Sequence, residues 1–366
     1  MNTESALQGA IAESVKAAKA SFAKIDEGRL CRFIEQCAGA PGQVELGILH
    51  YPSEGAGSSN GIAFFSATIK AGEFAGHHQL VLRYSPGVQL LKQKTFEHEF
   101  FTMQAVASAG LPVPKLYWLD KDGTELGAKG YIMATVDGDP PAAAMYSKGP
   151  LANVSPDERK AMMLQAAAFH GRLRKAAIGP EQVPHLCNRG EGDTAVQREL
   201  DWWMKEVLLV NSPDDNKSLE VAALRDWLVR NEPADLYEPV LVHGDAQIAN
   251  LIYANGTLAA AIDWELSYLG HNEADIALIC FLTKANHVLD IAVEGTPSDA
   301  EYLAEFEAAS GHKVSHWPYF QLLNAYRIVA VTSLSAHYMP QFDAVWAFHK
   351  AYLDEMWVAA RLVYGE

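Results

Sequence analysis

The sequence predicts an α+β fold of two lobes, a small lobe built on an antiparallel sheet and a larger lobe that is mainly helical. The chain has 366 residues, which is more than one compact core usually holds. Its pattern also changes near residue 136, from short β-branched and aromatic runs to long segments with helical spacing. We therefore expect residues 1–135 to form the first lobe, with a helical N-terminal extension, and residues 136–366 to form the second.

The first lobe begins with a predicted helix at 3–39, where apolar residues at helical spacing alternate with strong helix formers. From 44 to 87, short apolar runs are separated by Gly, Ser, Pro and His clusters, a pattern typical of antiparallel strands. Residues 92–109 return to helical spacing, and LPVP at 111–114 ends that helix because proline cannot continue it. GYIMATVDGDPP at 130–141 is an apolar strand that leaves into a Gly/Pro-rich connection, the expected lobe boundary.

The second lobe is mostly helical by the same criterion of apolar spacing. A strand pair interrupts it, because Asn255 and Gly256 stand between the runs LIYA and TLAAAID, and Asn-Gly is a strong signal for a β-hairpin. This hairpin should bring Asn250 and Asp263, which stand at its two ends, side by side. The predicted helices are 155–176, 194–210, 217–230, 271–290, 298–309 and, in pieces, 316–362.

Composition narrows the classes of function and partner. The formal net charge of −16 repels polyphosphate backbones and anionic headgroups, so we expect no nucleic-acid partner and no membrane partner. The four cysteines are scattered without CxxC pairing, which argues against a disulfide framework and a structural zinc site and favours a reducing compartment. The N-terminal segment lacks the apolar core of a signal peptide, and eighteen apolar residues never run together. These features predict a cytoplasmic protein, and they carry no signal for its oligomeric state.

The stretch VLVHGDAQIANLIY, residues 240–253, carries the candidate chemistry. It places Asp245 on a loop before the hairpin, Asn250 at the hairpin's start and Asp263 at its end. Carboxylate and amide oxygens without sulfur suit Mg²⁺, which takes further ligands from phosphate. Phosphoryl transfer needs such parts: an aspartate that accepts a hydroxyl proton, and an asparagine and a later aspartate for metal. HGD alone is more typical of a turn at a strand end; the asparagine spacing, the hairpin and DWE at 263–265 favour the catalytic interpretation.

Four segments resemble the aminoglycoside phosphotransferase family of kinase-fold enzymes, and within it the kinase-like domains fused to acyl-CoA dehydrogenases. The resemblance covers roughly residues 44–340. It implies a protein-kinase-like bilobal fold with a five-stranded sheet, a nucleotide-binding first lobe, and transfer of phosphate from ATP or GTP, with Mg²⁺, to a hydroxyl of a small molecule. The segments are HGDAQIANLIY, AAIDWELSYLGHNEADIAL, YFQLLNAYRIVAVTSL and RYSPGVQLLKQKTFEHEFFTMQAVASAGLPVPKLYWL.

The resemblance assigns roles at the catalytic end. Asp245 accepts the proton of the acceptor hydroxyl, with His243 beside it in the catalytic loop, and Asn250 and Asp263 hold the metal. His243 and Glu265 shape the loop and the surroundings of the metal.

Asp275 fits a family aspartate that supports the catalytic segment from the following helix. The alternative is an acidic residue that the helix dipole favours at a helix N-terminus.

The nucleotide side departs further from the kinase pattern. EGAGSSNG misses GxGxxG by one residue. Family members often have a Gly-Ser-Asn turn here, which implies that Ser58, Ser59 and Asn60 approach phosphate; an ordinary polar hairpin loop is the alternative. Arg83 stands where protein kinases have lysine and would clamp phosphate, while Tyr84 replaces a second basic residue common in similar chains.

Glu99 is the implied acidic partner of Arg83 on the following helix. Glu97 is its rival by register, and a solvent-facing acid is the third interpretation. The backbone around Met133 to Val136 would bind the adenine edge, with the Met133 side chain against the ring; a core methionine is compatible with both roles.

The acceptor is less defined by the sequence. A small metabolite alcohol is favoured over an aminoglycoside-like compound, although an acidic protein is compatible with a polycationic drug. Trp202 and Trp203 form either an apolar acceptor wall or part of the core.

Two other classes of function stay open at this point. One is a nucleotide-binding pseudokinase or regulatory module, suggested by Arg83 and the irregular glycine loop. The other is a metallohydrolase that uses His243, Asp245 and Asp263. Such sites need further histidines, and His170, His185 and His271 show no motif of that kind.

Overall fold

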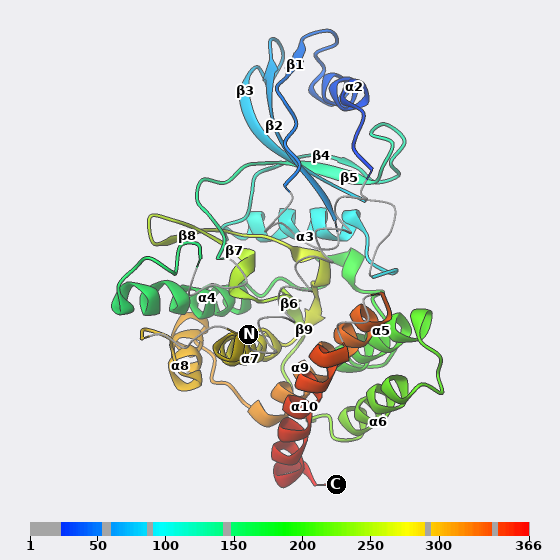
Figure 1. Cartoon of the computed structure of the whole chain (residues 1–366), viewed down its shortest axis with the longest axis vertical. Coiled ribbons are helices and arrows are strands. Elements are labelled where there is room, and N and C mark those ends of the chain that lie inside the picture. Colours follow the sequence, from blue (N-terminus) through cyan, green and yellow to red (C-terminus); the bar gives the residue numbers. More distant parts are fainter. Residues whose placement is uncertain are drawn as a thin grey trace.

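The computed structural model describes residues 23–52, 60–85, 91–141, 148–289, 294–338 and 343–365. It has an antiparallel sheet at one end and a larger helical part at the other, as predicted (Figure 1). The first 22 residues, and with them most of the predicted N-terminal helix, lie outside the described part. Ser58 and Ser59 lie outside it as well.

The sheet has five strands in the order β1-β2-β3-β5-β4, and every neighbouring pair is antiparallel. This confirms the predicted architecture of the first lobe. β2 and β3 pair along their whole length, from Gly61 opposite Tyr84 to Ile69 opposite Gly76. The strands are β1 (Val44–Leu46), β2 (Gly61–Ile69), β3 (Gly76–Tyr84), β4 (Leu116–Asp120) and β5 (Gly130–Ala134).

Helices cover both faces of this sheet, so β3 is buried from Leu80 to Tyr84. Because successive side chains of a strand point to opposite faces, Leu80 and Leu82 share a core with helix α2 (Glu27–Ala38). Val81 points the other way and packs in the core that includes helix α3 (Phe96–Ser108). Arg83 follows Val81 by two residues and therefore shares the α3 face. The strand period alone places this arginine toward the helix that carries Glu99.

α3 starts later than the predicted residue 92 because Thr95 caps it. The Thr95 side chain accepts a hydrogen bond from the backbone N–H of His98 at 3.2 Å, which satisfies one of the free donors at the helix N-terminus. The helix ends before Gly110, whose φ is 76°, and the LPVP segment follows as expected.

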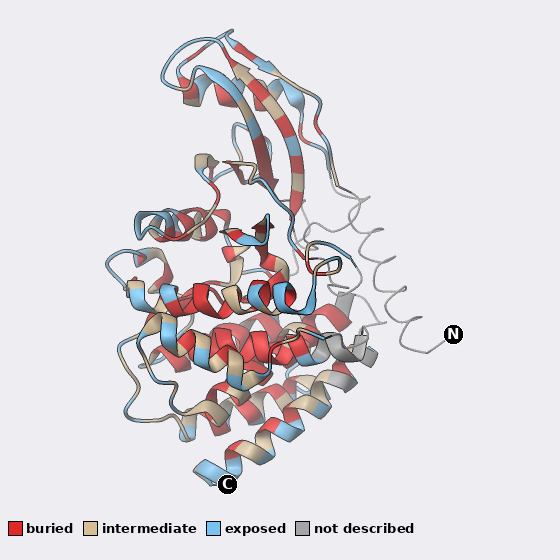
Figure 2. Ribbon diagram, turned by 90° about the vertical axis from the view of Figure 1, so that its left-hand side faces the viewer, coloured by how far each residue is buried: buried red, intermediate tan, exposed pale blue. Residues whose placement is uncertain are grey.

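The helical part contains two hydrophobic cores. One core joins α3 to α4, α7 and α8, and the other is built by α5, α6, α9 and α10. Buried residues line the inward sides of these helices (Figure 2). The helices are α4 (Pro156–Ala176), α5 (Ala195–Val210), α6 (Asn216–Arg230), α7 (Glu273–Leu289), α8 (Asp299–Ser310), α9 (Trp317–Tyr338) and α10 (Asp343–Tyr364).

The Asn-Gly hairpin forms as predicted, between β7 (Leu251–Ala254) and β8 (Thr257–Ala261). Asn255 and Gly256 have φ values of 50° and 77°, as a two-residue turn with left-handed backbone requires. A second short pair, β6 (Val240–Val242) with β9 (Tyr268–Gly270), lies beside it. These two pairs hold the chain on both sides of the catalytic candidates.

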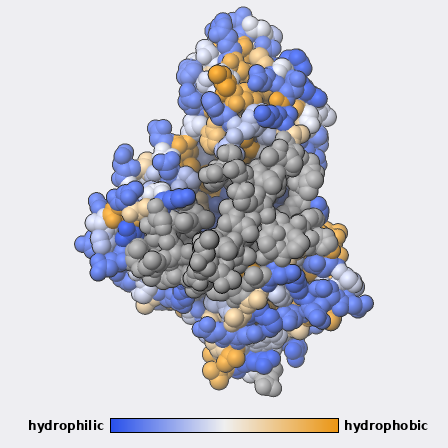
Figure 3. All heavy atoms as spheres, in the orientation of Figure 1, coloured by the Kyte–Doolittle hydropathy of each residue, from blue (hydrophilic) through white to orange (hydrophobic). Residues whose placement is uncertain are grey.

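Where Figure 3 shows the helical part in colour, its surface is mostly hydrophilic, and apolar side chains appear on the strand part and at the lower end of the helical part. Among the residues that the structure describes, no helix combines the length and apolar character needed to cross a bilayer.

We expect the fold to lose stability in acid because several histidines are held as neutral rings, among them the buried His271 and the half-buried His349. Burial lowers the pKa of His271 and of His349 to about 4, whereas an unfolded histidine titrates near ~6.5. Between pH ~6.5 and ~4 the unfolded chain therefore binds protons that the folded chain does not bind. The free energy of unfolding falls as the pH drops through this range. Each ring contributes about 1.4 kcal/mol per pH unit within this window.

Urea unfolding at pH 7 and pH 5 measures this loss. His349→Gln should show a smaller loss between the two pH values than the wild type, by about 2 kcal/mol. An equal loss in both proteins would contradict the assignment to His349.

Candidate active site

The catalytic loop leaves β6 at His243 and turns sharply at Gly244. The φ of Gly244 is 82°, a backbone conformation that residues with a Cβ rarely adopt. A Cβ at this position would also lie 2.0 Å from the carbonyl oxygen of Leu266. The middle residue of HGD is therefore glycine for two reasons, the backbone angle and the close approach of the segment after Asp263.

Asp275 holds this loop from the first turn of α7. Its carboxylate accepts hydrogen bonds from the backbone N–H groups of His243 at 2.9 Å and Gly244 at 3.0 Å. It also lies 3.1 Å from Nδ1 of His170. Burial by itself would raise the pKa of the Asp275 carboxyl, but His170 and the loop outweigh it and lower the pKa. The supporting role and the helix N-terminal position, left as alternatives by the sequence, both hold.

The His243 ring is held by backbone on both sides. Its Nδ1 accepts from the N–H of Asp245 at 3.2 Å, and its Nε2 lies 3.1 Å from the carbonyl oxygen of Ile262. Nε2 therefore carries the proton, and burial lowers the pKa of the ring to about 3. Neither nitrogen has a free lone pair, so His243 shapes the loop and is unsuited to proton transfer or to metal ligation. The metallohydrolase interpretation thereby loses the histidine on which it depended.

Asp245 follows this turn in the chain. One of its carboxylate oxygens accepts hydrogen bonds, and the other is available. Oδ2 accepts from Nε2 of Gln247 and from Nδ2 of Asn250, each at 2.8 Å. No described residue donates a hydrogen bond to Oδ1. Burial, and then the nearby charge of Asp263, raise the pKa of the Asp245 carboxyl to about 7. A carboxylate of that pKa is a suitable proton acceptor near neutral pH.

The hairpin brings Asn250 and Asp263 to the same end, as its turn predicts. The backbone N–H of Ile262 donates to the carbonyl of Asn250 at 2.9 Å, so Asp263 follows directly after the residue opposite Asn250. Asp263 has a φ of 66°, a strained conformation that is common at functional sites. Since Nδ2 of Asn250 donates to Asp245, its amide oxygen is the atom left for a cation, and no described residue hydrogen-bonds to it.

Arg83 crosses from the sheet to this end of the hairpin. Its Nη2 lies 2.8 Å from Oδ1 of Asp263 and 3.2 Å from Oε1 of Glu99. Burial would lower the pKa of the guanidinium, but the carboxylates of Asp263 and Glu99 outweigh it and raise the pKa. Nε of Arg83 is buried and has no hydrogen-bond acceptor among the described residues. That donor fits a phosphate oxygen.

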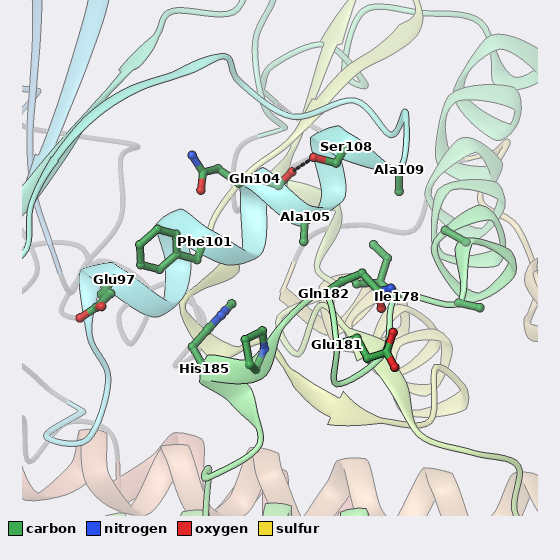
Figure 4. Close-up of a pocket in the computed structure, with 13 residues that line it drawn as sticks. Glu97, Phe101, Gln104, Ala105, Ser108, Ala109, Ile178, Glu181, Gln182 and His185 are labelled. Atoms are coloured by element: carbon green, nitrogen blue, oxygen red, sulfur yellow. Dashed lines mark hydrogen bonds between the residues drawn. The ribbon is translucent and has the colours of Figure 1, made fainter.

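Glu99, rather than its rival Glu97, faces Arg83. Burial, partly offset by Arg83, raises the pKa of the Glu99 carboxyl to about 7. Glu97 lies on another side of α3 and lines a groove of about 750 Å³ between α3 and the segment that follows α4. In Figure 4, Glu97, Phe101 and Gln104 lie along α3, opposite Glu181 and His185. None of the catalytic candidates lines this groove.

Asn60 and Glu265 meet at the entrance to the site. Nδ2 of Asn60 donates to Oε2 of Glu265 at 2.7 Å, and the same oxygen accepts from Nζ of Lys94 at 2.7 Å. Glu265 also lies 3.5 Å from Arg83, and the approach of Asn60 to phosphate stays a prediction. Lys94 was not singled out from the sequence, because its partners lie in distant segments.

The sequence reasoning also missed Arg327, a buried residue of α9. Nη2 of Arg327 donates to the carbonyl of Gly244, and Nε donates to Oε1 of Glu199 at 3.0 Å. Glu199 also pairs with Arg189 at 3.0 Å. A single arginine within the apolar run NAYRIVAV is the signal that would have pointed to it, because a buried charge needs a specific partner.

Among Ala134, Thr135 and Val136, one backbone N–H group remains available to bind the adenine edge. Met133 is buried in the main core. The N–H groups of Ala134 and Thr135 already donate to the carbonyls of Lys115 and Gln79. Val136 is half-buried, and its N–H has no hydrogen-bond partner among the described residues. The Met133 and Val136 assignments stay predictions, with the Val136 N–H as the donor that remains for adenine.

The two neighbouring tryptophans differ in role. Both are buried and belong to the α5, α6, α9 and α10 core, and Nε1 of Trp203 donates to Glu199 at 2.8 Å. Trp202 also lines a cavity of about 100 Å³ together with Lys94, Arg189 and Glu265. The Arg189 guanidinium stacks on the Trp202 ring, 3.8 Å from its centroid, and most of the cavity lining is polar. An acceptor wall at Trp202 therefore stays a prediction, while Trp203 is a core residue.

Replacing Gly244 with alanine should disrupt the catalytic loop. We expect a loss of unfolding free energy of about 2 kcal/mol or more, since the left-handed backbone alone costs about 1–2 kcal/mol and the contact with Leu266 adds to it. Gly256→Ala is the matched control, because Gly256 has a φ of 77° but a Cβ there would meet nothing within 4 Å. Thermal or urea unfolding of both variants separates the cost of the left-handed backbone from the cost of the contact with Leu266. Equal losses would show that the close contact at 244 relaxes freely.

Comparisons with known proteins follow this geometry. A family model described as "Phosphotransferase enzyme family" matches residues 69–323. The chain is 29% identical over 286 residues to the Arabidopsis thaliana protein named "Probable acyl-CoA dehydrogenase IBR3", covering 72% of this chain and 34% of that protein. It is 27% identical over 266 residues to acyl-CoA dehydrogenase family member 10 of Mus musculus, covering 69% of this chain and 24% of that protein. The chain thus spans about a third or less of these relatives.

Solved structures show the same fold at lower identity. A protein described as a "putative aminoglycoside phosphotransferase" from Ralstonia eutropha has a TM-score of 0.67 and 22% identity, with 92% of this chain and 99% of that chain covered. Choline kinase from Cryptosporidium parvum has a TM-score of 0.59 and 13% identity, with 93% and 99% covered. The bilobal kinase-like fold and the resemblance stated from the motifs are confirmed. The chain therefore belongs to the phosphotransferase enzyme family.

Proposed function

We propose that this protein transfers the γ-phosphoryl group of ATP to a hydroxyl of a small metabolite. The observation that carries the proposal is the position and acidity of Asp245. Its pKa is raised to about 7, one oxygen is held by Gln247 and Asn250, and the other is available to a hydroxyl. The adjacent hairpin end and Arg83 supply the groups for metal and phosphate.

The donor set at the hairpin end suits Mg²⁺. The amide oxygen of Asn250 and the carboxylate of Asp263 are hard oxygen donors, and Asp263 keeps part of its side chain open to solvent. When bound, the ion neutralises charge on the phosphates. Asn250 also positions Asp245, because its Nδ2 donates to Asp245 Oδ2 while its oxygen is left for the metal.

The remaining steps belong to residues of the chain. Asp245 Oδ1 accepts the proton of the acceptor hydroxyl as the hydroxyl oxygen bonds to the γ-phosphorus, while the bond from that phosphorus to the β–γ bridging oxygen breaks and ADP leaves. Nε of Arg83 donates to a phosphate oxygen, and Glu99 holds the guanidinium in place. His243 and Asp275 keep the loop in its turn. The N–H of Val136 would bind the adenine edge.

A metabolite hydroxyl is the acceptor that the relatives favour. The chain matches proteins named acyl-CoA dehydrogenases over some 70% of its length, which supports a hydroxyl carried by an acyl-type metabolite more than an aminoglycoside-like compound.

A nucleotide-binding module without phosphotransfer is the second candidate. It is favoured by the 2.8 Å pair between Arg83 and Asp263, which ties the proposed metal residue to the proposed phosphate residue. ATP and ADP binding in the presence of Mg²⁺, measured beside ADP release with a library of hydroxy acids, alcohols and aminoglycosides, separates the two. Acceptor-dependent ADP release supports the kinase; nucleotide binding with no release from any acceptor supports the module; GTP in competition settles the choice of nucleotide.

A further inference from the structure

Lys94 is a buried cation at the junction of three segments of the site. It precedes Thr95, the cap of α3, and its side chain is only 4% exposed. Its Nζ lies 2.7 Å from Oε2 of Glu265 and 3.2 Å from Oδ1 of Asn60. The approach to α3, the start of β2 and the segment after Asp263 therefore meet at one ammonium group.

Arg83 reaches the same oxygen from the sheet. Oε2 of Glu265 lies 3.5 Å from Nη2 of Arg83 and 2.7 Å from Nζ of Lys94, so the two cations are separated by less than these two distances together. Their closeness is tolerated because Glu265 stands between them. A polyphosphate chain bound by Arg83 therefore comes within reach of Lys94.

Tyr84, the residue after Arg83, supplies no such contact. It is fully buried, and its ring fills the space over Gly61, where a Cβ would lie 2.4 Å from the ring. A second cation for phosphate must come from another element, and the approach to α3 provides one.

We propose that Lys94 is a second phosphate-binding cation of the nucleotide site, held by Glu265 and Asn60 until the phosphates replace that carboxylate. This proposal rests on the proposed function. An ammonium is a compact point charge on a flexible stem, so it moves from Glu265 to a phosphate oxygen by side-chain rotation alone. A polyphosphate carries more negative charge than one carboxylate and competes for the ammonium.

If the Lys94–Glu265 ion pair were purely structural, the variants of these two residues would affect nucleotide binding differently from what the proposal predicts. If Lys94 only fastens the lobes, then removing Lys94 or removing the charge of Glu265 breaks the same contact and harms nucleotide binding alike. If Lys94 binds phosphate, removing Lys94 weakens binding, whereas neutralising Glu265 frees Lys94 and tightens binding. The two variants should then act with opposite sign.

The experiment titrates ADP and, separately, adenosine onto the full chain in EDTA, so that loss of metal is not the readout. Lys94→Met should weaken ADP binding about 10- to 100-fold, as expected for the loss of a charged hydrogen bond, and leave adenosine within about twofold. Glu265→Gln, which frees Lys94, should bind ADP more tightly than the wild type. Lys92→Met, at an exposed lysine two residues away, is the matched control and should bind like the wild type.

Unchanged ADP affinity in Lys94→Met would overturn the proposal, as would equal weakening for ADP and adenosine. Should Lys94→Met fail to fold, Glu265→Gln decides: tighter ADP binding supports the proposal, and equal or weaker binding overturns it. If the wild type binds neither ADP nor adenosine, in EDTA or with Mg²⁺, the proposed function itself falls and Lys94 with it. Wild-type binding with an unaffected Lys94→Met removes only the role of Lys94.

Discussion

Asp245→Asn should lower kcat by about 10²- to 10⁴-fold, the usual contribution of a positioned general base. Asparagine keeps the size of the side chain and one oxygen for the bonds now made to Gln247 and Asn250. It cannot accept the proton of the acceptor hydroxyl. The loss should therefore appear in kcat, with nucleotide affinity and the unfolding midpoint close to those of the wild type.

Steady-state kinetics with a turned-over acceptor and ADP titrations check this result. Asp122→Asn changes an exposed aspartate in the turn after β4 and controls for the loss of one negative charge. Turnover by Asp245→Asn within tenfold of the wild type would be incompatible with proton acceptance by Asp245.

Asp275→Ala should lower the free energy of unfolding by about 3–5 kcal/mol, the cost of breaking a buried charged network by removing one partner. The variant leaves the buried N–H groups of His243 and Gly244 without their acceptor. It also leaves His170, whose Nδ1 lies 3.1 Å from Asp275, without its carboxylate. Because the loop that carries Asp245 depends on these bonds, activity should fall together with stability.

Urea unfolding measures the change, with Asp343→Ala as the control. Asp343 pairs with Lys217 at 2.6 Å near the surface, and exposed pairs contribute about 0–1 kcal/mol. A loss below ~1 kcal/mol in Asp275→Ala would mean that the loop amides find other acceptors.

Local features of the fold follow from the sequence because their causes are local. The Asn255–Gly256 turn needs two left-handed residues in a row, which this dipeptide supplies, and the hairpin forms there. Helix α4 starts at Pro156 with a capping box between Ser155 and Glu158, next to the predicted 155. Thr95 caps α3, which the apolar pattern alone did not reveal, so that boundary was predicted four residues too early.

Contacts between distant segments are the part that the sequence did not predict. Lys94 and Glu265 are 171 residues apart, and Arg327 and Gly244 are 83 apart. No periodicity links such positions. The choice between Glu97 and Glu99 was also open, because both are acidic residues of the same helix, and only the packing of α3 under the sheet turns Glu99 toward Arg83.

From the sequence alone came the antiparallel character of the sheet, most helices of the second lobe and the hairpin that joins Asn250 to Asp263, because turn chemistry and apolar period act within short segments. The tertiary structure decided which charges meet: Arg83 with Glu99 and Asp263, Lys94 with Glu265, and Asp275 with the loop amides. It also decided that His243 is a neutral, hydrogen-bonded support, because burial and neighbouring groups set the protonation state of a side chain, and neither is written in its position along the chain.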